Sequence, residues 1–236
     1  MKAWQENQLQ ALQSIQCEHQ LFEAILSFSA DLGFDYCAYG MRMPLPLANP
    51  QVVMFNNYPA AWQAQYQAEN YIVVDPTVRH GLHSLQPILW TDDLFSPVAE
   101  MWEEARSFGL QHGWAQATRD FNGAAGMLTL ARSNEAITEA ELADKAFKMT
   151  WLAQIAHTAM SRCLVPKLLP EADTKLSSRE IAVLRWTADG KTAGEIAAIL
   201  KIAERTVNFH VNNAVVKLNA ANKTSAAVKA AILGLL

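Results

Sequence analysis

Two helix-start signals in the last quarter of the chain constrain its fold more than any other feature of the sequence. Residues 177–180 (Ser-Ser-Arg-Glu) and 192–195 (Thr-Ala-Gly-Glu) each place a hydroxyl at a helix N-cap and a glutamate three residues later, the pattern of a capping box. Residues 201–203 leave room only for a tight turn before a third helix, Glu204 to Leu218. The segment 176–218 therefore predicts a helix-turn-helix.

The third predicted helix has an apolar and a polar side. Apolar residues at spacings of three and four predict a buried stripe. The polar side carries residue types that bond phosphates or base edges. The candidate DNA-binding residues are Arg205, Thr206, Asn208, His210, Asn212, Asn213 and Lys217, with Lys191 and Thr192 before the second helix.

Basic side chains on a helical hairpin more often form a solvated surface than a DNA-binding face, so the charge distribution matters. Residues 171–236 carry nine Lys and Arg against six Asp and Glu, whereas residues 1–170 carry ten against seventeen. The net charges of +3 and −7 make up the chain's −4. A positive excess confined to the helix-turn-helix indicates a DNA-binding module joined to a module that does not bind DNA.

This C-terminal segment resembles the DNA-binding domain of LuxR-type regulators. The resemblance rests on residues 176–180 (LSSRE), 183–186 (VLRW), 190–192 (GKT), 195–197 (EIA) and 206–210 (TVNFH). It implies a four-helix module whose third helix enters the major groove. Two departures imply modest DNA affinity. Ala203 replaces a common capping Ser or Asp, which costs about 1 kcal/mol of helix stability, and Val216 replaces a common Arg.

The first 165 residues predict a different architecture. Helical patterns precede, interrupt and follow strand patterns, and a capping box at residues 138–141 opens a long helix. The expected helices are residues 4–16, 18–32, 60–70, 97–111 and 138–162, and the expected strands 34–43, 52–56, 114–119 and 127–132. The fold class is therefore an α/β ligand-binding domain, an α/β/α sandwich around an antiparallel sheet, followed by an all-α helix-turn-helix domain.

The N-terminal half resembles the acyl-homoserine-lactone-binding domain of LuxR-type quorum-sensing receptors. The resemblance rests on residues 57–62 (NYPAAW), Tyr66, 75–78 (DPTV), Trp90, 102–105 (WEEA) and 123–130. With the C-terminal match it covers nearly the whole chain. It implies a quorum-sensing transcriptional regulator whose small-molecule ligand is an N-acyl-homoserine lactone.

The polar head of such a lactone needs two hydrogen-bond donors and one acceptor from the protein. Trp62 suits the lactone carbonyl, Tyr58 suits the amide carbonyl, and ionised Asp75 suits the amide N–H. Thr129 stands where family members carry a hydroxyl and adds a further bond.

Each of these residues also has a structural interpretation. Asp75-Pro76 is an ordinary helix start, with Asp as cap and Pro in the first turn. Trp62 and Tyr66 lie four residues apart, which is typical of core packing on a helix, and Trp90 and Phe95 fit a core equally well. The ligand hypothesis depends on the polar groups occurring together in the family's order and approximate spacing.

The remaining pocket residues are implied by the same resemblance. The full candidate set is Tyr58, Trp62, Tyr66, Asp75, Thr77, Val78, Trp90, Phe95, Met101, Ala38, Gly40, Met54 and Thr129, with Val52 and Leu128 also in the acyl-chain lining. Small and flexible residues favour an acyl chain of about eight to twelve carbons, because each buried methylene contributes about 0.8 kcal/mol. Arg42, near the end of this channel, either bonds a 3-oxo group through water or lies on the surface, and we favour the surface.

Other classes of protein are disfavoured. The sequence has no G-x-S-x-G elbow, no H-E-x-x-H series and no metal spacing among its three Cys and six His, so we expect neither an enzyme nor a cofactor or metal. No apolar run reaches the ~18 residues of a membrane span, and the polar N-terminus lacks a signal peptide. We expect a cytoplasmic protein with reduced, mostly buried thiols.

The expected domain organisation has three parts. Residues 1–165 bind ligand and dimerise, residues 166–175 form a linker where Pro166 and Pro170 break the long helix, and residues 176–236 bind DNA. The expected partners are the lactone, double-stranded DNA and a second copy of the chain, with RNA polymerase a candidate and no membrane. The long helix, with Phe147, Trp151, Ile155 and Met160, is either the dimer face or wholly internal. The alternative function is a regulator of the same architecture that answers to another small molecule or to none.

Overall fold

The computed structural model describes residues 2–236, and their side chains from Gln8 onward. The chain forms two compact units. Among the described residues, the first comprises 2–42, 52–119 and 125–164, and the second comprises 43–51, 120–124 and 165–236.

A five-stranded antiparallel sheet is the centre of the first unit. In spatial order its strands are β2 (Val52–Asn56), β1 (Tyr36–Arg42), β5 (Ala125–Arg132), β4 (His112–Arg119) and β3 (Ile88–Leu89). This confirms the expected α/β domain with an antiparallel sheet. The two-residue β3 has no counterpart in the sequence analysis, because its pattern is too short to show alternation.

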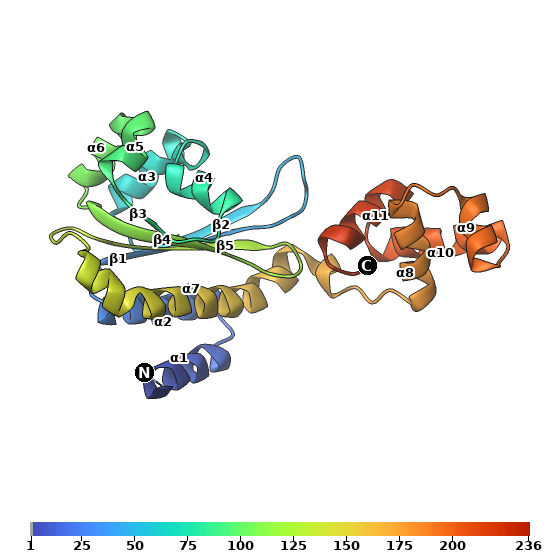
Figure 1. Ribbon diagram of the computed structural model, residues 1–236, viewed down its shortest axis with the longest axis horizontal. Helices are drawn as coiled ribbons and strands as arrows, with labels where there is room; N and C mark the ends of the chain where they lie inside the picture. Colours follow the sequence, from blue (N-terminus) through green and yellow to red (C-terminus); the bar gives the residue numbers. More distant parts are fainter. Residues whose placement is uncertain (1) are drawn as a thin grey trace. The chain divides into compact units, whose positions relative to one another are not determined.

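Helices cover both faces of this sheet (Figure 1). One face packs against α2 (Glu18–Asp31) and the long α7 (Glu139–Leu168), and α1 (Lys2–Ser14) lies beyond them. The other face lies under α3 (Ala60–Ala68), α4 (Pro76–His83), α5 (Asp92–Phe95) and α6 (Ala99–Ser107), with single 3-10 turns at Tyr71–Val73 and Ser96–Val98. The order is the predicted α/β/α sandwich.

Strand alternation divides the side chains of the sheet between these faces. Tyr39, Leu128 and Leu130 point to the side of α2 and α7 and are fully buried there. The Tyr39 hydroxyl lies 2.8 Å from Nδ1 of His157 on α7, which shows that this helix packs directly on the strands. We refer to this side as the helix-packed face.

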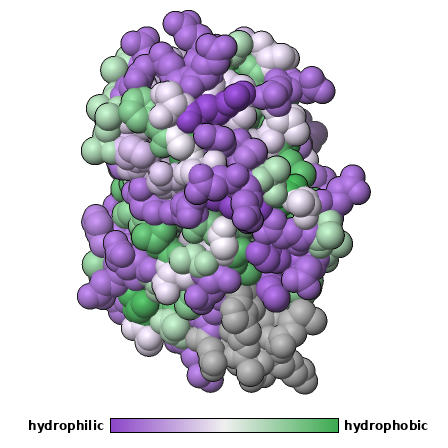
Figure 2. All heavy atoms as spheres, turned by 90° about the vertical axis from the view of Figure 1, so that its left-hand side faces the viewer, coloured by the Kyte–Doolittle hydropathy of each residue, from purple (hydrophilic) through white to green (hydrophobic). Residues whose placement is uncertain are grey.

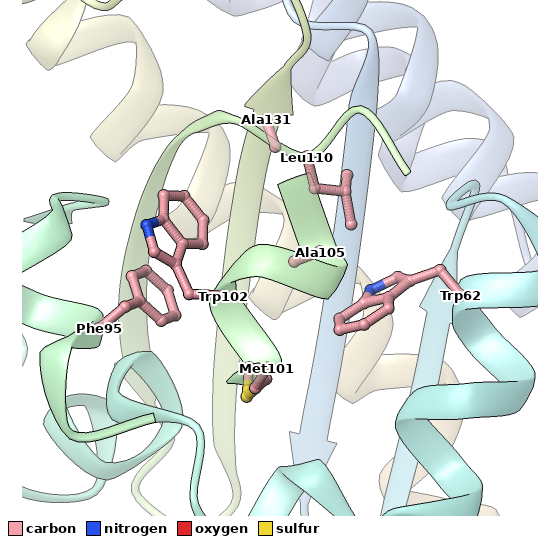
Figure 3. Close-up of a cluster of buried hydrophobic side chains, with 7 residues drawn as sticks. All are labelled: Trp62, Phe95, Met101, Trp102, Ala105, Leu110 and Ala131. Atoms are coloured by element: carbon pink, nitrogen blue, oxygen red, sulfur yellow. The ribbon is translucent and has the colours of Figure 1, made fainter. Parts of the chain in front are cut away.

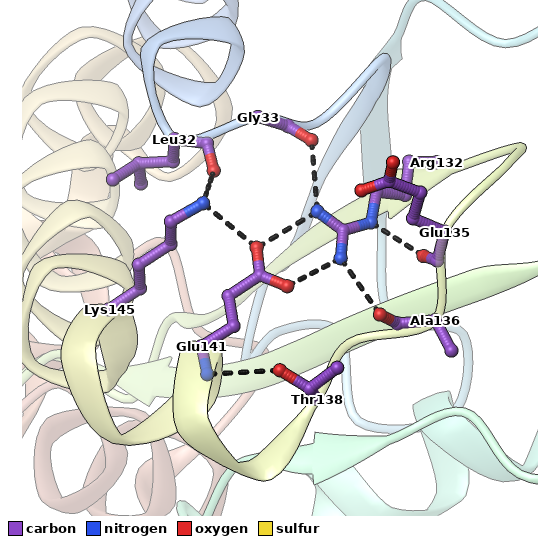
Figure 4. A network of polar contacts seen from close by, with 8 residues as sticks. All are labelled: Leu32, Gly33, Arg132, Glu135, Ala136, Thr138, Glu141 and Lys145. Atoms are coloured by element: carbon purple, nitrogen blue, oxygen red, sulfur yellow. Dashed lines mark hydrogen bonds and ion pairs between the residues drawn. The ribbon is translucent and has the colours of Figure 1, made fainter.

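The start of α7 only half follows the predicted capping box. Thr138 Oγ1 accepts a hydrogen bond from the Glu141 amide at 3.1 Å, as expected. The Glu141 carboxylate, however, does not return to Thr138. It binds the Arg132 guanidinium through two bonds and the Lys145 ammonium at 2.8 Å (Figure 4). A charged partner competes better for a carboxylate than a backbone amide does.

The end of α7 differs from the expected linker. The helix continues through Pro166 to Leu168, so Pro166 does not break it, and a 3-10 turn at Pro170–Asp173 follows. A proline removes one amide donor from a helix but leaves the neighbouring turns intact. Here Leu164, Val165 and Leu169, on both sides of the proline, are buried.

The second unit contains four helices among its described residues: α8 (Ser178–Ala188), α9 (Ala193–Leu200), α10 (Glu204–Lys217) and α11 (Lys223–Ile232). Both capping boxes form as predicted, at Ser177 with Glu180 and at Thr192 with Glu195. Asn222 caps α11, and Ala203 provides no side-chain cap to α10. Val183, Ile196, Ala197, Val207 and Val211 form a small core. The predicted helix-turn-helix is confirmed.

The exposed surface carries little contiguous apolar area on the face drawn in Figure 2, where hydrophilic residues dominate. On α7, Ile155 and Met160 are buried within the unit, whereas Phe147 is 58% exposed. Trp151 is half-buried, so the C-terminal part of this stripe is internal and its N-terminal part reaches the surface. No helix among the described residues is long and apolar enough to cross a membrane.

Candidate functional site

A cavity of about 500 Å³ lies between the sheet and helices α3 to α6. Every residue of the candidate ligand-binding set from the sequence lines it: Tyr58, Trp62, Tyr66, Asp75, Thr77, Val78, Trp90, Phe95, Met101, Ala38, Gly40, Met54 and Thr129. We refer to this side of the sheet as the cavity face. Leu128 was expected in the lining but belongs to the helix-packed face, because it pairs with Tyr39 and lies one residue out of phase with Thr129.

Asp75 is the buried acceptor of the cavity. Its Oδ1 accepts hydrogen bonds from the Thr77 amide at 2.8 Å and the Thr77 hydroxyl at 2.6 Å, and its Oδ2 accepts one from the Tyr66 hydroxyl at 3.0 Å. It is the N-cap of α4, with Pro76 in the first turn, so the helix-start interpretation is correct. Ionised carboxylates have about four acceptor positions. Three are used by these bonds, and the Val78 amide also stabilises the charged carboxylate.

Burial raises the pKa of Asp75, although the bonds from Thr77 and Tyr66 oppose the shift. Burial also raises the pKa of Tyr58 and of Tyr66, and the Asp75 charge adds to both shifts. Both phenols therefore stay protonated at neutral pH and act as donors.

Aromatic rings form the walls around this polar group. Trp62 stacks on Tyr71 at a centroid distance of 5.9 Å and meets Tyr66 edge to face at 5.8 Å. On the other side of α6, Phe95 stacks on Trp102 at 4.4 Å with nearly parallel rings (Figure 3). Met101 and Ala105 lie between the two aromatic groups on α6. The result is an apolar end with a few polar atoms, the composition of a small-molecule site.

The Trp90 indole nitrogen is a further polar atom at this end. It is buried and has no hydrogen-bond partner in the part of the chain that the structure describes. Such groups usually have a partner in the functional state of a protein.

Several residues that line the cavity were not predicted from the sequence. They include Asn56, Gly81, Leu82, Trp102, Leu110, Ala117, Ala125 and Met127. Alternation on β5 would have found Ala125 and Met127, since both share a face with Thr129. The residues from α4 and α6 depend on tertiary packing and have no local signal.

The other end of the cavity reaches the surface. Val52, Met54 and Leu82 line it and are 47%, 42% and 39% exposed. Arg42 lines the same end and is itself exposed, as we favoured. The cavity therefore has an aromatic, buried end and an open end.

The candidate DNA-binding residues lie mainly on one helix. Arg205, Asn208 and Asn212 of α10 are exposed, and Thr206, His210 and Asn213 are half-buried. Two exposed apolar side chains share this helix, Phe209 at 59% and Val216 at 78%. Lys191 and Thr192 are exposed before α9.

Two candidates have internal partners that the sequence did not reveal. The Lys217 ammonium binds Glu180 Oε2 at 2.8 Å, which ties α10 to α8. Burial disfavours the Glu180 carboxylate, but the bonds from Lys217 and Ser177 outweigh it and lower its pKa. The Thr192 hydroxyl belongs to its capping box. A DNA contact by either side chain stays a prediction.

No group of three or more His, Cys, Asp or Glu side chains with the arrangement of a metal site occurs among the described residues.

Two family models match the chain and cover most of it. Residues 18–160 match the family described as "Autoinducer binding domain", and residues 174–230 match "Bacterial regulatory proteins, luxR family". The first match contains the cavity, and the second contains the helix-turn-helix.

Individual proteins are similar over their whole length. "Transcriptional activator protein AnoR" of Acinetobacter nosocomialis is 48% identical, with both chains fully covered. The crystal structure of SdiA from Escherichia coli has a TM-score of 0.86 at 36% identity and covers 99% of this chain and 98% of that one. A second SdiA structure, in complex with octanoyl-rac-glycerol, has a TM-score of 0.84 at 36% identity and covers 99% and 95% of the two chains.

Proposed function

This chain belongs to the LuxR family of quorum-sensing transcriptional regulators, and we propose that its autoinducer is an N-acyl-homoserine lactone with a medium to long acyl chain. We further propose that it acts as a homodimer on partly palindromic promoter DNA. It is not an enzyme, since its relatives are transcriptional regulators.

The observation that carries the ligand proposal is Asp75, a buried carboxylate that lines a mostly apolar cavity together with Tyr58 and Trp62. A lactone's amide N–H satisfies that acceptor. Tyr58 and Trp62 donate to the two carbonyls, and Phe95 and Met101 pack against the ring. A ligand without an N–H would lack this contact to the buried carboxylate.

Ligand binding then stabilises the folded N-terminal unit. A ligand that binds only the folded state adds RT ln(1 + [L]/Kd), about 2.7 kcal/mol at a hundredfold excess over Kd. This is enough to decide whether a marginally stable receptor accumulates.

The DNA proposal rests on α10, whose exposed Arg205, Asn208 and Asn212 present phosphate- and base-bonding groups. One helix-turn-helix reads one half-site, so a homodimer needs two half-sites about 34 Å apart, one turn of the double helix. We expect this to happen in the cytoplasm, where RNA polymerase is a candidate further partner. The domains would be residues 1–165 for ligand and dimerisation and 176–236 for DNA, with the linker between them.

Thermal unfolding tests the ligand half. The protein is expressed without ligand, and its Tm is measured with homoserine lactones of four to fourteen acyl carbons and with octanoyl-rac-glycerol. We expect a chain-length-dependent rise with the lactones that Asp75→Ala and Trp62→Phe both reduce. A rise with the glycerol ester alone would favour the alternative, a regulator of this architecture that answers to another small molecule.

Promoter binding tests the DNA half. We expect Asn212→Ala to relax base preference without abolishing binding. Lys217→Ala should weaken binding to all sequences alike through a fall in the stability of the C-terminal unit, because Glu180 loses its partner. Sedimentation with and without ligand checks for the dimer.

A further inference from the structure

We propose that strand β1 acts as a ruler for the acyl chain and that Gly40 sets the chain length that the cavity accepts. This inference rests on the proposed lactone ligand. It concerns three residues of β1 that share the cavity face at successive positions, Ala38, Gly40 and Arg42.

The strand register defines three rows of side chains along the cavity. The first is Ala38 with Asn56 and Thr129, the second is Gly40 with Met54 and Met127, and the third is Arg42 with Val52 and Ala125. All of these residues line the cavity. The rows therefore follow its length.

The position of the aromatic side chains determines the direction in which the acyl chain runs along β1. Ala131 lies one row before Ala38, opposite Tyr36, and packs in one cluster with Trp62, Phe95 and Trp102. The head group thus lies at the Ala131 end, and the acyl chain must run from the Ala38 row toward the Arg42 row. The cavity reaches the surface along the last two rows, where Met54 and Val52 are exposed.

The row spacing converts into carbon numbers. Two residues of an antiparallel strand advance about 7 Å, and a carbon chain with bonds of about 1.5 Å at near-tetrahedral angles advances about 1.25 Å per bond. If the amide carbonyl lies level with Thr129, the chain reaches the Gly40 row at about its sixth or seventh carbon and the Arg42 row at about its twelfth. Longer chains end in solvent beside Arg42.

At the middle row, Gly40 places no side chain in the cavity. A Cβ built on Gly40 would have no heavy atom within 4 Å, so the space in front of it is empty. Its φ is outside the left-handed region, and a strand position of this kind accepts any side chain. Glycine here serves neither a turn nor close packing. It leaves the middle of the cavity free.

Substitutions at the three positions test the proposal, with Kd measured for lactones of four to fourteen carbons. We expect Gly40→Val to weaken binding of chains of eight carbons or more by at least about tenfold and to change chains of four carbons little. Gly40→Ala should give a smaller effect with the same length dependence. Ala38→Val should weaken every length, and Arg42→Ala should alter only chains of twelve and fourteen carbons.

Val53→Ala is the matched control, because Val53 lies on β2 between two lining residues but is not part of the lining. It should preserve the wild-type order of affinities. If wild type binds lactones and Gly40→Val weakens all lengths equally, or none, the ruler is wrong and the lactone receptor stands. If wild type binds no lactone of any length, the proposed function fails and the ruler fails with it.

Discussion

The two faces of the N-terminal sheet differ in how closely side chains pack against the strands. On the helix-packed face, a Cβ added to Gly126 would lie 2.3 Å from His157 Nδ1 and 2.9 Å from the Tyr39 hydroxyl. On the cavity face, a Cβ added to Gly40 would meet nothing within 4 Å. Two glycines on adjacent strands thus have different reasons to be there: one permits close packing, and the other leaves space.

The comparison shows that one face of the sheet contributes mainly to the stability of the fold and the opposite face to ligand recognition. Interiors packed at crystal-like density fix the strands from the side of α2 and α7. The other side can then hold a cavity without losing the fold. Substitutions on the helix-packed face should therefore change stability, whereas those on the cavity face should change ligand response.

The largest expected effect is on the helix-packed face, at Arg132. Its guanidinium is largely buried and binds Glu141 through two hydrogen bonds. Arg132→Met leaves that carboxylate without its main partner and should lower the free energy of unfolding by about 3 to 5 kcal/mol. Urea unfolding at pH 7 measures it. An effect below 1 kcal/mol would show that Lys145 compensates.

The same ion pair predicts an acid dependence. The bonds from Arg132 lower the pKa of Glu141 from 4.5 to about 2. Because the folded value lies below the unfolded one, this stabilisation is present above pH 4.5 and is lost as pH falls toward 2. The stability difference between wild type and Arg132→Met should therefore shrink across that range.

Gly126→Val should have the next largest effect. The new side chain meets His157 and Tyr39, and such overpacking costs about 1 to 3 kcal/mol. Gly40→Ala is its matched control and should change stability by less than about 1 kcal/mol. Equal losses in the two variants would remove the difference between the faces.

Asp75→Asn should leave the empty protein nearly unchanged and abolish its ligand response. Asparagine still accepts from Thr77, and it removes a carboxylate whose pKa burial raises. A raised folded pKa means that stability is lost as pH rises through it, so the variant with a neutral residue should match or exceed wild type in stability at pH 7. Its NH2 group offers no acceptor to a ligand N–H, and thermal shifts with lactones measure the loss.

Tyr66→Phe should give the smallest change. It removes one donor to Asp75 Oδ2, a bond of 3.0 Å, and should lower stability by about 1 kcal/mol or less. The freed lone pair leaves Asp75 a less rigid acceptor. We expect lactone affinity to fall a fewfold with unchanged length preference, and calorimetric titration across the lactone series checks both.

Local signals made the second unit predictable from its sequence. Each capping box needs only residues three positions apart, and both formed. The capping box predicted at residues 138–141 forms only in part. Glu141 binds a stronger partner, Arg132, which the local sequence pattern does not include. The prediction that Pro166 breaks the long helix was also wrong. Helix α7 continues to Leu168, and residues on both sides of the proline are buried.

The cavity was predictable only through resemblance. Its walls come from strands β1, β2, β4 and β5 and from helices α3 to α6, and no spacing in the sequence relates them. Strict alternation would have corrected one error, since Leu128 and Thr129 cannot face the same way on a strand. Asp75 shows that a structural and a functional interpretation can both hold: the residue caps α4 and also faces the cavity.

The ion pair between Lys217 and Glu180 has a consequence for how promoters are held. With Lys217 bound to Glu180 and an uncharged Val216 on its surface, α10 presents Arg205 as its remaining Lys or Arg side chain. DNA sheds about 0.9 condensed counterion for each phosphate that a protein neutralises. A recognition helix with so few charges should therefore release few of them, so most of the response of promoter occupancy to the potassium content of the cell should come from basic residues outside α10, such as Lys191.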